Sequence, residues 1–103
     1  MTFGDALEKM KEGQKVARAG WNGKSMWIAL TPGSLIPVGS ARPGAAGHLA
    51  TEAIAGAKDL HEAETKTIRI MGHIDMRAAD GSLVIGWLAS QTDMLAEDWS
   101  IVE

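Results

Sequence analysis

Hydrophobic residues recur along this chain with two different periods, and each period predicts a different kind of element. Near the N-terminus the spacing is helical, with the apolar stripe Phe3, Ala6, Leu7 and Met10. We therefore predict an amphipathic helix over Thr2 to Glu12. Thr2 can cap its start, with Asp5 three residues later in a variant of the capping box. Gly13 suits the left-handed position that follows a helix end.

Further along, the period changes to two, which is typical of a half-buried strand. Residues 26–31 place Met26, Ile28 and Leu30 on one face and Trp27, Ala29 and Thr31 on the other. Residues 67–77 carry the strongest strand pattern in the chain, and we predict one continuous strand there. Its apolar face holds Ile68, Ile70, Gly72, Ile74 and Met76, and its other face holds Arg69, Met71, His73, Asp75 and Arg77.

Shorter patterns complete the fold. We predict strands at residues 15–19, 35–38, 83–88 and 99–102, with Pro37 favouring an edge position for the second. Residues 79–82, Ala-Asp-Gly-Ser, predict a hairpin turn. Ser90 and Asp93 repeat the capping-box pattern ahead of a short helical turn through Ala96. The sum is an α+β domain, a small antiparallel sheet with the N-terminal helix packed on one face.

Residues 39–64 differ in composition from the rest of this single domain, which we take as residues 1–103. The first part, residues 39–47, is rich in glycine, alanine and proline and predicts a flexible loop. Residues 48–64 have helical spacing, but the apolar stripe is thin and Gly56 weakens it. We therefore expect a helical or loop insertion, either mobile or used as an oligomer contact.

Charge and composition narrow the choice of function. The net charge of −3 and the scattered cations argue against a DNA or RNA partner, which usually needs a basic face. No apolar run is long enough to span a membrane, and the N-terminus has no secretion signal. The absence of cysteine excludes disulfides and thiolate catalysis, which is compatible with a reducing cytosol. The negative net charge does not argue against a small anionic ligand, because such a ligand needs only one or two local hydrogen-bond donors.

The stretch from Arg18 to Trp27 is the densest in candidate chemistry. It holds two tryptophans, two cations, an amide side chain and two glycines. Tryptophan offers a large apolar face with one polar edge, and glycine lets a backbone approach a ligand closely. This mixture would suit a planar polar ligand such as a nucleobase. The alternative is a turn whose tryptophans are buried in the hydrophobic core and contact no ligand.

Signals for catalysis are weak. The chain lacks a phosphate-binding loop, a nucleophile elbow and a His-Glu-x-x-His helix. His48, His61 and His73 are too scattered to indicate a metal site. His73 and Asp75 share a strand face and could form an acid/base pair or two metal ligands, although such a pair also suits a surface or interface hydrogen bond. We therefore expect no catalytic residue, no metal site and no cofactor.

Signals for binding are stronger. The polar face of residues 67–77 can hold a ribose hydroxyl or clamp a phosphate, or it can form cross-strand salt bridges. The amides of residues 90–92 can bind an anion, or serve only to start the helix. Trp99 suits the core, whereas Trp21, Trp27 and Trp87 are stacking candidates, with Trp27 also suited to packing or a subunit contact.

Three segments together resemble a known family. They are residues 2–24, with the sequence Val-Ala-Arg-Ala-Gly-Trp-Asn-Gly-Lys at their end, then residues 73–81, then residues 87–99 with Ser-Gln-Thr-Asp. Their order is similar to that of the second type of Thoeris anti-defence (Tad) protein, a phage and prophage family. The resemblance covers both ends of the chain, and residues 39–64 depart from it.

The resemblance implies a non-enzymatic sponge. Members of this family bind the cyclic ADP-ribose signal that a bacterial TIR-domain enzyme makes on infection, and some relatives hold cyclic dinucleotides of the CBASS system. They are homotetramers with pockets at subunit contacts. It follows that this chain would bind a cyclic nucleotide in the cytoplasm of the infected bacterial host. The alternatives from the residues alone are a phosphodiesterase-like enzyme that degrades such signals and a phage structural or assembly protein.

The resemblance also implies a site. Trp21 would stack on an adenine, with Asn22 and Lys24 beside it. The Ser90 to Asp93 turn would offer amides and side chains to phosphate or ribose, through Ser90, Gln91, Thr92 and Asp93. His73 and Asp75 would contact either the ligand or a neighbouring subunit.

Overall fold

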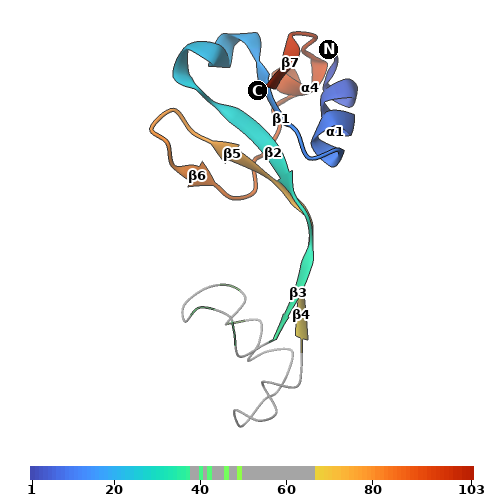
Figure 1. Ribbon diagram of the computed structural model, residues 1–103, viewed down its shortest axis with the longest axis vertical. Helices are drawn as coiled ribbons and strands as arrows, with labels where there is room; N and C mark the ends of the chain where they lie inside the picture. The colour runs from blue at the N-terminus through green and yellow to red at the C-terminus, as the bar shows by residue number, and fades with distance from the viewer. Residues whose placement is uncertain (38–39, 41, 43–45, 47–48, 50–66) are drawn as a thin grey trace. The chain divides into compact units, whose positions relative to one another are not determined.

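The structure is a computed structural model that describes residues 1–37, 40, 42, 46, 49 and 67–103, with the side chains of residues 22 and 23 left out of the description (Figure 1). The chain forms two compact units, one of residues 1–32 and 72–103 and the other of residues 33–71. The predicted insertion at residues 39–64 lies almost entirely outside the described residues, and so do His48 and His61. No helix among the described residues is long and apolar enough to cross a membrane.

Helix α1 spans Phe3–Lys11 and begins as predicted. The Thr2 hydroxyl accepts from the Asp5 N–H at 3.2 Å, and the Thr2 N–H donates to the Asp5 carboxylate at 3.1 Å. Together these two bonds form a capping box, which satisfies N–H groups that a helix start otherwise leaves unpaired. Gly13 follows the helix at φ +91°, in the left-handed region that glycine enters at little cost.

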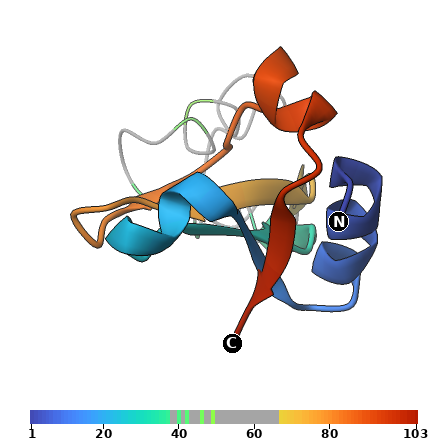
Figure 2. The same cartoon turned by 90° about the horizontal axis from the view of Figure 1, so that it is seen from above.

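The first unit contains a five-stranded antiparallel sheet in the order β6-β5-β2-β1-β7 (Figures 1 and 2). Its strands are β1 (Lys15–Arg18), β2 (Trp27–Thr31), β5 (His73–Arg77), β6 (Leu83–Val84) and β7 (Trp99–Val102). A 3₁₀ helix, η1 (Ala19–Lys24), joins β1 to β2. Because α1 contacts β1, β2 and β7, the predicted α+β fold class is confirmed.

One face of this sheet forms the core with α1. Val16 lies opposite Ile28, and Ile28 lies opposite Met76. Among the described residues, the buried members of this core are Ala6, Met10, Val16, Ile28 and Trp99, and Ala17 is buried on the opposite face of β1. Because successive side chains of a strand point to opposite faces, Lys15, Trp27, His73, Asp75 and Arg77 belong to the other face.

The predicted single strand at residues 67–77 is wrong in one respect. It is divided into β4 (Thr67–Ile70) and β5, with Met71 and Gly72 between them. β4 pairs with β3 (Ser34–Pro37) in a two-stranded sheet of the second unit, whereas β5 pairs with β2. The alternation of side chains continues through the break, but the partner strand changes because Pro32 and Gly33 end β2.

The predicted hairpin after β5 is confirmed, and the strand after it is shorter than predicted. The Ala78 N–H donates to the Ser82 carbonyl at 2.8 Å, and the Gly81 N–H to the Ala78 carbonyl at 2.9 Å. The predicted strand over residues 83–88 is reduced to β6, because Gly86 adopts φ +81°, which a strand does not accommodate. Helix α4 (Gln91–Leu95) then begins at the predicted cap, Ser90.

Candidate ligand-binding site

An aromatic cluster of Phe3, Trp21, Trp87 and Trp99 lies where η1, α1 and the C-terminal segment meet. The Trp21 ring meets Trp99 edge-on at 5.3 Å between centroids and 84°, and Trp87 at 6.2 Å and 78°. Edge-to-face contacts of this kind are favourable for aromatic rings. Trp21 is half-buried, so it packs in this cluster and still reaches the surface.

Trp99 occupies the centre of the cluster. It is 2% exposed, which confirms its predicted place in the core, and its ring lies 5.3 Å from that of Phe3. The indole Nε1–H donates to the Asp93 carbonyl at 3.0 Å. Since a buried indole N–H needs a partner, this bond fixes α4 against the cluster.

Arg18 joins the tryptophan-bearing stretch to the C-terminal segment. Its Nη1 donates to Asp93 Oδ1 at 2.9 Å and its Nε donates to Asp98 Oδ1 at 3.0 Å. The Ala19 N–H adds a bond to the Asp98 carbonyl at 3.2 Å. Segments separated by more than seventy residues in the sequence are therefore held side by side.

Asp93 is held as a carboxylate. Its Oδ2 accepts from the Ser90 hydroxyl at 2.8 Å and the Ser90 N–H at 3.3 Å, while Oδ1 accepts from Arg18. Burial acts to raise the pKa of Asp93, but the bonds from Ser90 and Arg18 outweigh it and hold the pKa below its ordinary value. The charge on Asp93 is thus used inside the protein, where it positions Ser90.

The remaining predicted residues of this region lie around the cluster. Ser90, Gln91 and Thr92 are exposed at the start of α4, and Lys24 is exposed at the end of η1. Asn22 lies in η1, but its side chain is outside the described part of the chain. The structure therefore gathers Trp21 and residues 90–93 at one place, joined through Arg18 and Trp99.

His73 and Asp75 form a pair, but on the other face of the sheet. Their neighbours Ile74 and Met76 pack against the core, so the pleat turns His73 and Asp75 away from the aromatic cluster. His73 Nδ1 lies 2.8 Å from Asp75 Oδ1. The structure does not bring this pair together with Trp21.

Asp75 is buried, although it lies on the polar face of its strand. It is 4% exposed, and it accepts hydrogen bonds from the Gly86 N–H at 2.9 Å and from the Thr31 hydroxyl. Burial acts to raise the pKa of Asp75, but the bonds from Thr31, Gly86 and His73 outweigh it and the pKa lies below its ordinary value. A strand pattern alone does not reveal which loop, here that of Gly86, covers a polar residue.

Sequence reasoning also missed the role of Arg18. The signal was present in part, since Arg18 alternates with Ala17 and so shares a face with Val16. Its partners Asp93 and Asp98 could not be identified without the pairing of Arg18 with Trp99 in β7. Among the described residues no group of three or more histidines and carboxylates is close enough to hold a metal ion.

The chain is thus a small α+β domain in which a tryptophan-bearing loop and a capped short helix are fastened together. It matches the family model for the Tad2-like, or Thoeris anti-defense 2-like, domain over residues 1–102, and it belongs to that family. It is 33% identical over 102 residues to Thoeris anti-defense 2 of Bacillus phage SP01, covering 99% of this chain and 94% of the relative. The resemblance read from the three motifs is confirmed, and membership implies an anti-defence role against Thoeris.

Proposed function

We propose that this chain counters Thoeris defence by binding and retaining a cyclic ADP-ribose isomer made by a TIR-domain enzyme, without cleaving it. The observation that supports this most directly is the joining of the two segments that carry the resemblance. Arg18 bonds to Asp93, and Trp21 packs on Trp99. A ring for stacking and a group of polar donors therefore lie at one surface, in the cytoplasm of the infected host where the signal would be met.

The proposed roles follow the family resemblance. Trp21 stacks on the adenine, an interaction worth about 1–3 kcal/mol for a base on an aromatic ring. The resemblance adds Asn22 and Lys24 to the adenine site, and the exposed Gln91 and Thr92 would contact phosphate or ribose. Ser90 and Asp93 bond to one another, so Asp93 acts mainly as a positioning residue for the start of α4.

Retention fits the chemistry of the carboxylates better than cleavage does. A general base works best with a pKa near the operating pH, whereas the pKa of Asp75 lies below its ordinary value. Its oxygens accept from Thr31, Gly86 and His73, which leaves it poorly placed to take a proton from a substrate. We assign the buried Asp75 to support of the sheet and the half-buried His73 to a ligand or subunit contact in a homotetramer.

Uptake and release of intact ligand test this proposal. The protein is incubated with a cyclic ADP-ribose isomer, freed of unbound ligand, heat-denatured and analysed by mass spectrometry. The expected result is release of the intact isomer. Recovery of a cleaved product would identify an enzyme instead, and no uptake of cyclic ADP-ribose isomers or of cyclic dinucleotides would refute both.

Two substitutions at one position test the site. Trp21→Ala removes the ring and should abolish uptake, while Trp21→Phe keeps a ring for stacking and should retain part of it. Both lose packing against Trp99, so thermal unfolding and mass in solution are measured alongside. If Trp21→Ala is folded and takes up ligand as the parent does, Trp21 is a packing residue only.

A further inference from the structure

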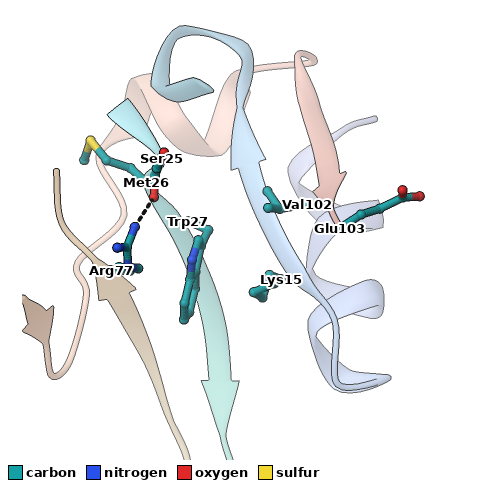
Figure 3. Close-up of a pocket in the computed structure, with 7 residues that line it drawn as sticks. All are labelled: Lys15, Ser25, Met26, Trp27, Arg77, Val102 and Glu103. Carbon is teal, nitrogen blue, oxygen red and sulfur yellow. Dashed lines mark hydrogen bonds between the residues drawn. The ribbon is translucent and has the colours of Figure 1, made fainter. Parts of the chain in front are cut away.

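The face of the sheet that points away from α1 carries a hollow with its own chemistry. The strand registers set Trp27 opposite Arg77 and Lys15 opposite Val102. These four side chains, with Glu103 and the Ser25–Met26 end of the η1–β2 connection, line a hollow of about 320 Å³, which we call the Trp27 hollow (Figure 3). Pockets that hold small molecules begin at about this volume.

The Trp27 indole stands between two cations. Lys15 Nζ lies 5.5 Å from the centre of the ring, and Figure 3 shows Arg77 on the other side of Trp27 from Lys15. Trp27 is half-buried, so its ring is both supported and accessible. A cation at that distance is held only weakly, by about 0.5–1 kcal/mol, and it can turn from the ring to an anion.

Arg77 is held in place at the rim. Its Nη1 donates to the Ser25 carbonyl at 3.0 Å, which uses one of the five N–H donors of a guanidinium. Figure 3 shows this bond beside the Trp27 ring, with the Glu103 carboxylate directed away from it. An arginine fixed in this way can meet a phosphate with two parallel N–H donors.

Ser25, which supplies that carbonyl, has a strained backbone. Its φ is +56°, a left-handed conformation that costs a residue with a side chain about 1–2 kcal/mol. Such conformations persist where the surrounding structure holds them and are common at ligand clamps. In this conformation the Ser25 carbonyl accepts from Arg77 Nη1, and this bond holds the guanidinium at the rim of the hollow.

We propose that the Trp27 hollow is a binding site for an aromatic base that carries one phosphate group, a ligand of the size of a nucleoside monophosphate. The base stacks on the Trp27 ring in place of the weakly held Lys15 ammonium, and the Arg77 guanidinium holds the phosphate, while Lys15 adds its positive charge to the hollow. This site is on the opposite face of the sheet from Trp21, and it is independent of the function proposed above. The hollow is lined by two cations and one carboxylate, and because the Glu103 carboxylate is directed away from the Trp27 ring (Figure 3), Lys15 and Arg77 set the charge beside the ring.

The test follows the indole N–H signals of the tryptophans by NMR while adenosine monophosphate is added. The Trp27 signal is assigned by its disappearance in Trp27→Phe. Adenosine and inorganic phosphate, the two halves of the probe, are titrated separately. We expect the monophosphate to shift the Trp27 signal and to bind more tightly than either half, and its affinity to fall with added salt.

Charge variants identify the donors. Arg77→Gln should weaken binding of the monophosphate by about tenfold, the value of one charge-assisted hydrogen bond. Lys15→Gln, which removes a charge beside the ring, should weaken binding by less than Arg77→Gln does. Lys11→Gln is the matched control, because Lys11 is exposed on α1 and pairs with Glu8. It removes the same charge away from the hollow and should change the affinity by less than about twofold.

Other outcomes would overturn the proposal. An unmoved Trp27 signal would show that the monophosphate does not bind in the Trp27 hollow. Equal binding of adenosine and its monophosphate would show that the hollow has no phosphate site. If Trp27→Phe and Arg77→Gln lower the mass in solution and leave the other signals unresponsive to the probe, the hollow is a contact between copies of the chain. Trp21→Ala should leave the shift at Trp27 intact, so this proposal and the previous one fail separately.

Discussion

The Arg18 guanidinium donates to the Asp93 carboxylate at 2.9 Å, joining residues that lie at opposite ends of the chain. The same guanidinium also holds Asp98. The side chains of Arg18 and Asp93 are both largely buried, so solvent screens this ion pair less than an ordinary surface pair. The attachment of α4 to the rest of the first unit therefore depends on Arg18 of β1 together with the Trp99 indole, which donates to the Asp93 carbonyl.

Removing the Arg18 bridge should loosen the C-terminal segment. Arg18→Gln leaves Asp93 and Asp98 without their cation, and we expect the midpoint of thermal unfolding to fall. Lys11→Gln serves as the control, since its pair with Glu8 is exposed on both sides and such pairs contribute little. Equal midpoints for the two variants would show that the bridge carries no stability.

Acid should destabilise the protein below about pH 4. The pKa values of Asp75 and Asp93 in the folded chain lie below the ordinary value of 3.8. The unfolded chain therefore binds more protons in that range, and stability that is fully present at higher pH is lost as the pH falls through the folded values. Urea unfolding measured at several pH values from 7 to 3 shows how the free energy of unfolding changes with pH.

The variant Asp75→Asn separates the contribution of Asp75. It cannot be ionised, and it loses acceptor capacity for Thr31, Gly86 and His73. At pH 7 we expect a loss of about 1–3 kcal/mol in the free energy of unfolding, as for other unsatisfied buried groups. The difference in free energy of unfolding between parent and variant should become smaller as the pH falls. A difference that stays constant would contradict the lowered pKa of Asp75.

Trp99 should be the most sensitive tryptophan for stability. Trp99→Phe opens space in the core and leaves the Asp93 carbonyl without its indole donor. We expect a loss of about 2–4 kcal/mol in the free energy of unfolding, which corresponds to about 4–8 °C in the unfolding midpoint for each kcal/mol. Trp27→Phe, at a half-buried position, should lower the free energy of unfolding clearly less. A larger loss for Trp27→Phe than for Trp99→Phe would contradict the central position of Trp99 in the core.

Two glycines provide a controlled test of backbone conformation. A Cβ at Gly13 or at Gly20 meets nothing within 4 Å, but only Gly13 has a positive φ, +91°. Gly13→Ala should therefore cost about 1–2 kcal/mol of stability through the backbone alone. Gly20→Ala should be neutral or slightly stabilising, because it restricts the unfolded chain. Chemical denaturation of both variants decides the point.

Local patterns predicted most of the secondary structure. Both capping boxes, the hairpin after β5 and the last strand depend on residues close together in the sequence, and the structure contains all of them. The break between β4 and β5 was not predictable in the same way, because it depends on which strands pair. The alternation of side chains is unchanged across Met71 and Gly72.

The candidate site was predictable only in part. The sequence picked out Trp21 and residues 90–93, and the resemblance joined them, but the Arg18 bridge depends on the register of β1 with β7. The burial of Asp75 depends on the loop that carries Gly86. The Trp27 hollow could have been foreseen from the alternation of β1 and β2 only if their register had been known.

The aromatic cluster also gives the protein a built-in optical probe. The Trp21, Trp87 and Trp99 rings lie 5.3–6.3 Å apart, centre to centre. Electronic transitions of indoles at such separations couple, and the coupling produces a pair of circular-dichroism bands of opposite sign that depends on the angle between the rings. A change at Trp21 can thus be followed in solution without a label, while Trp27, on the other face of the sheet, stays outside the coupled group.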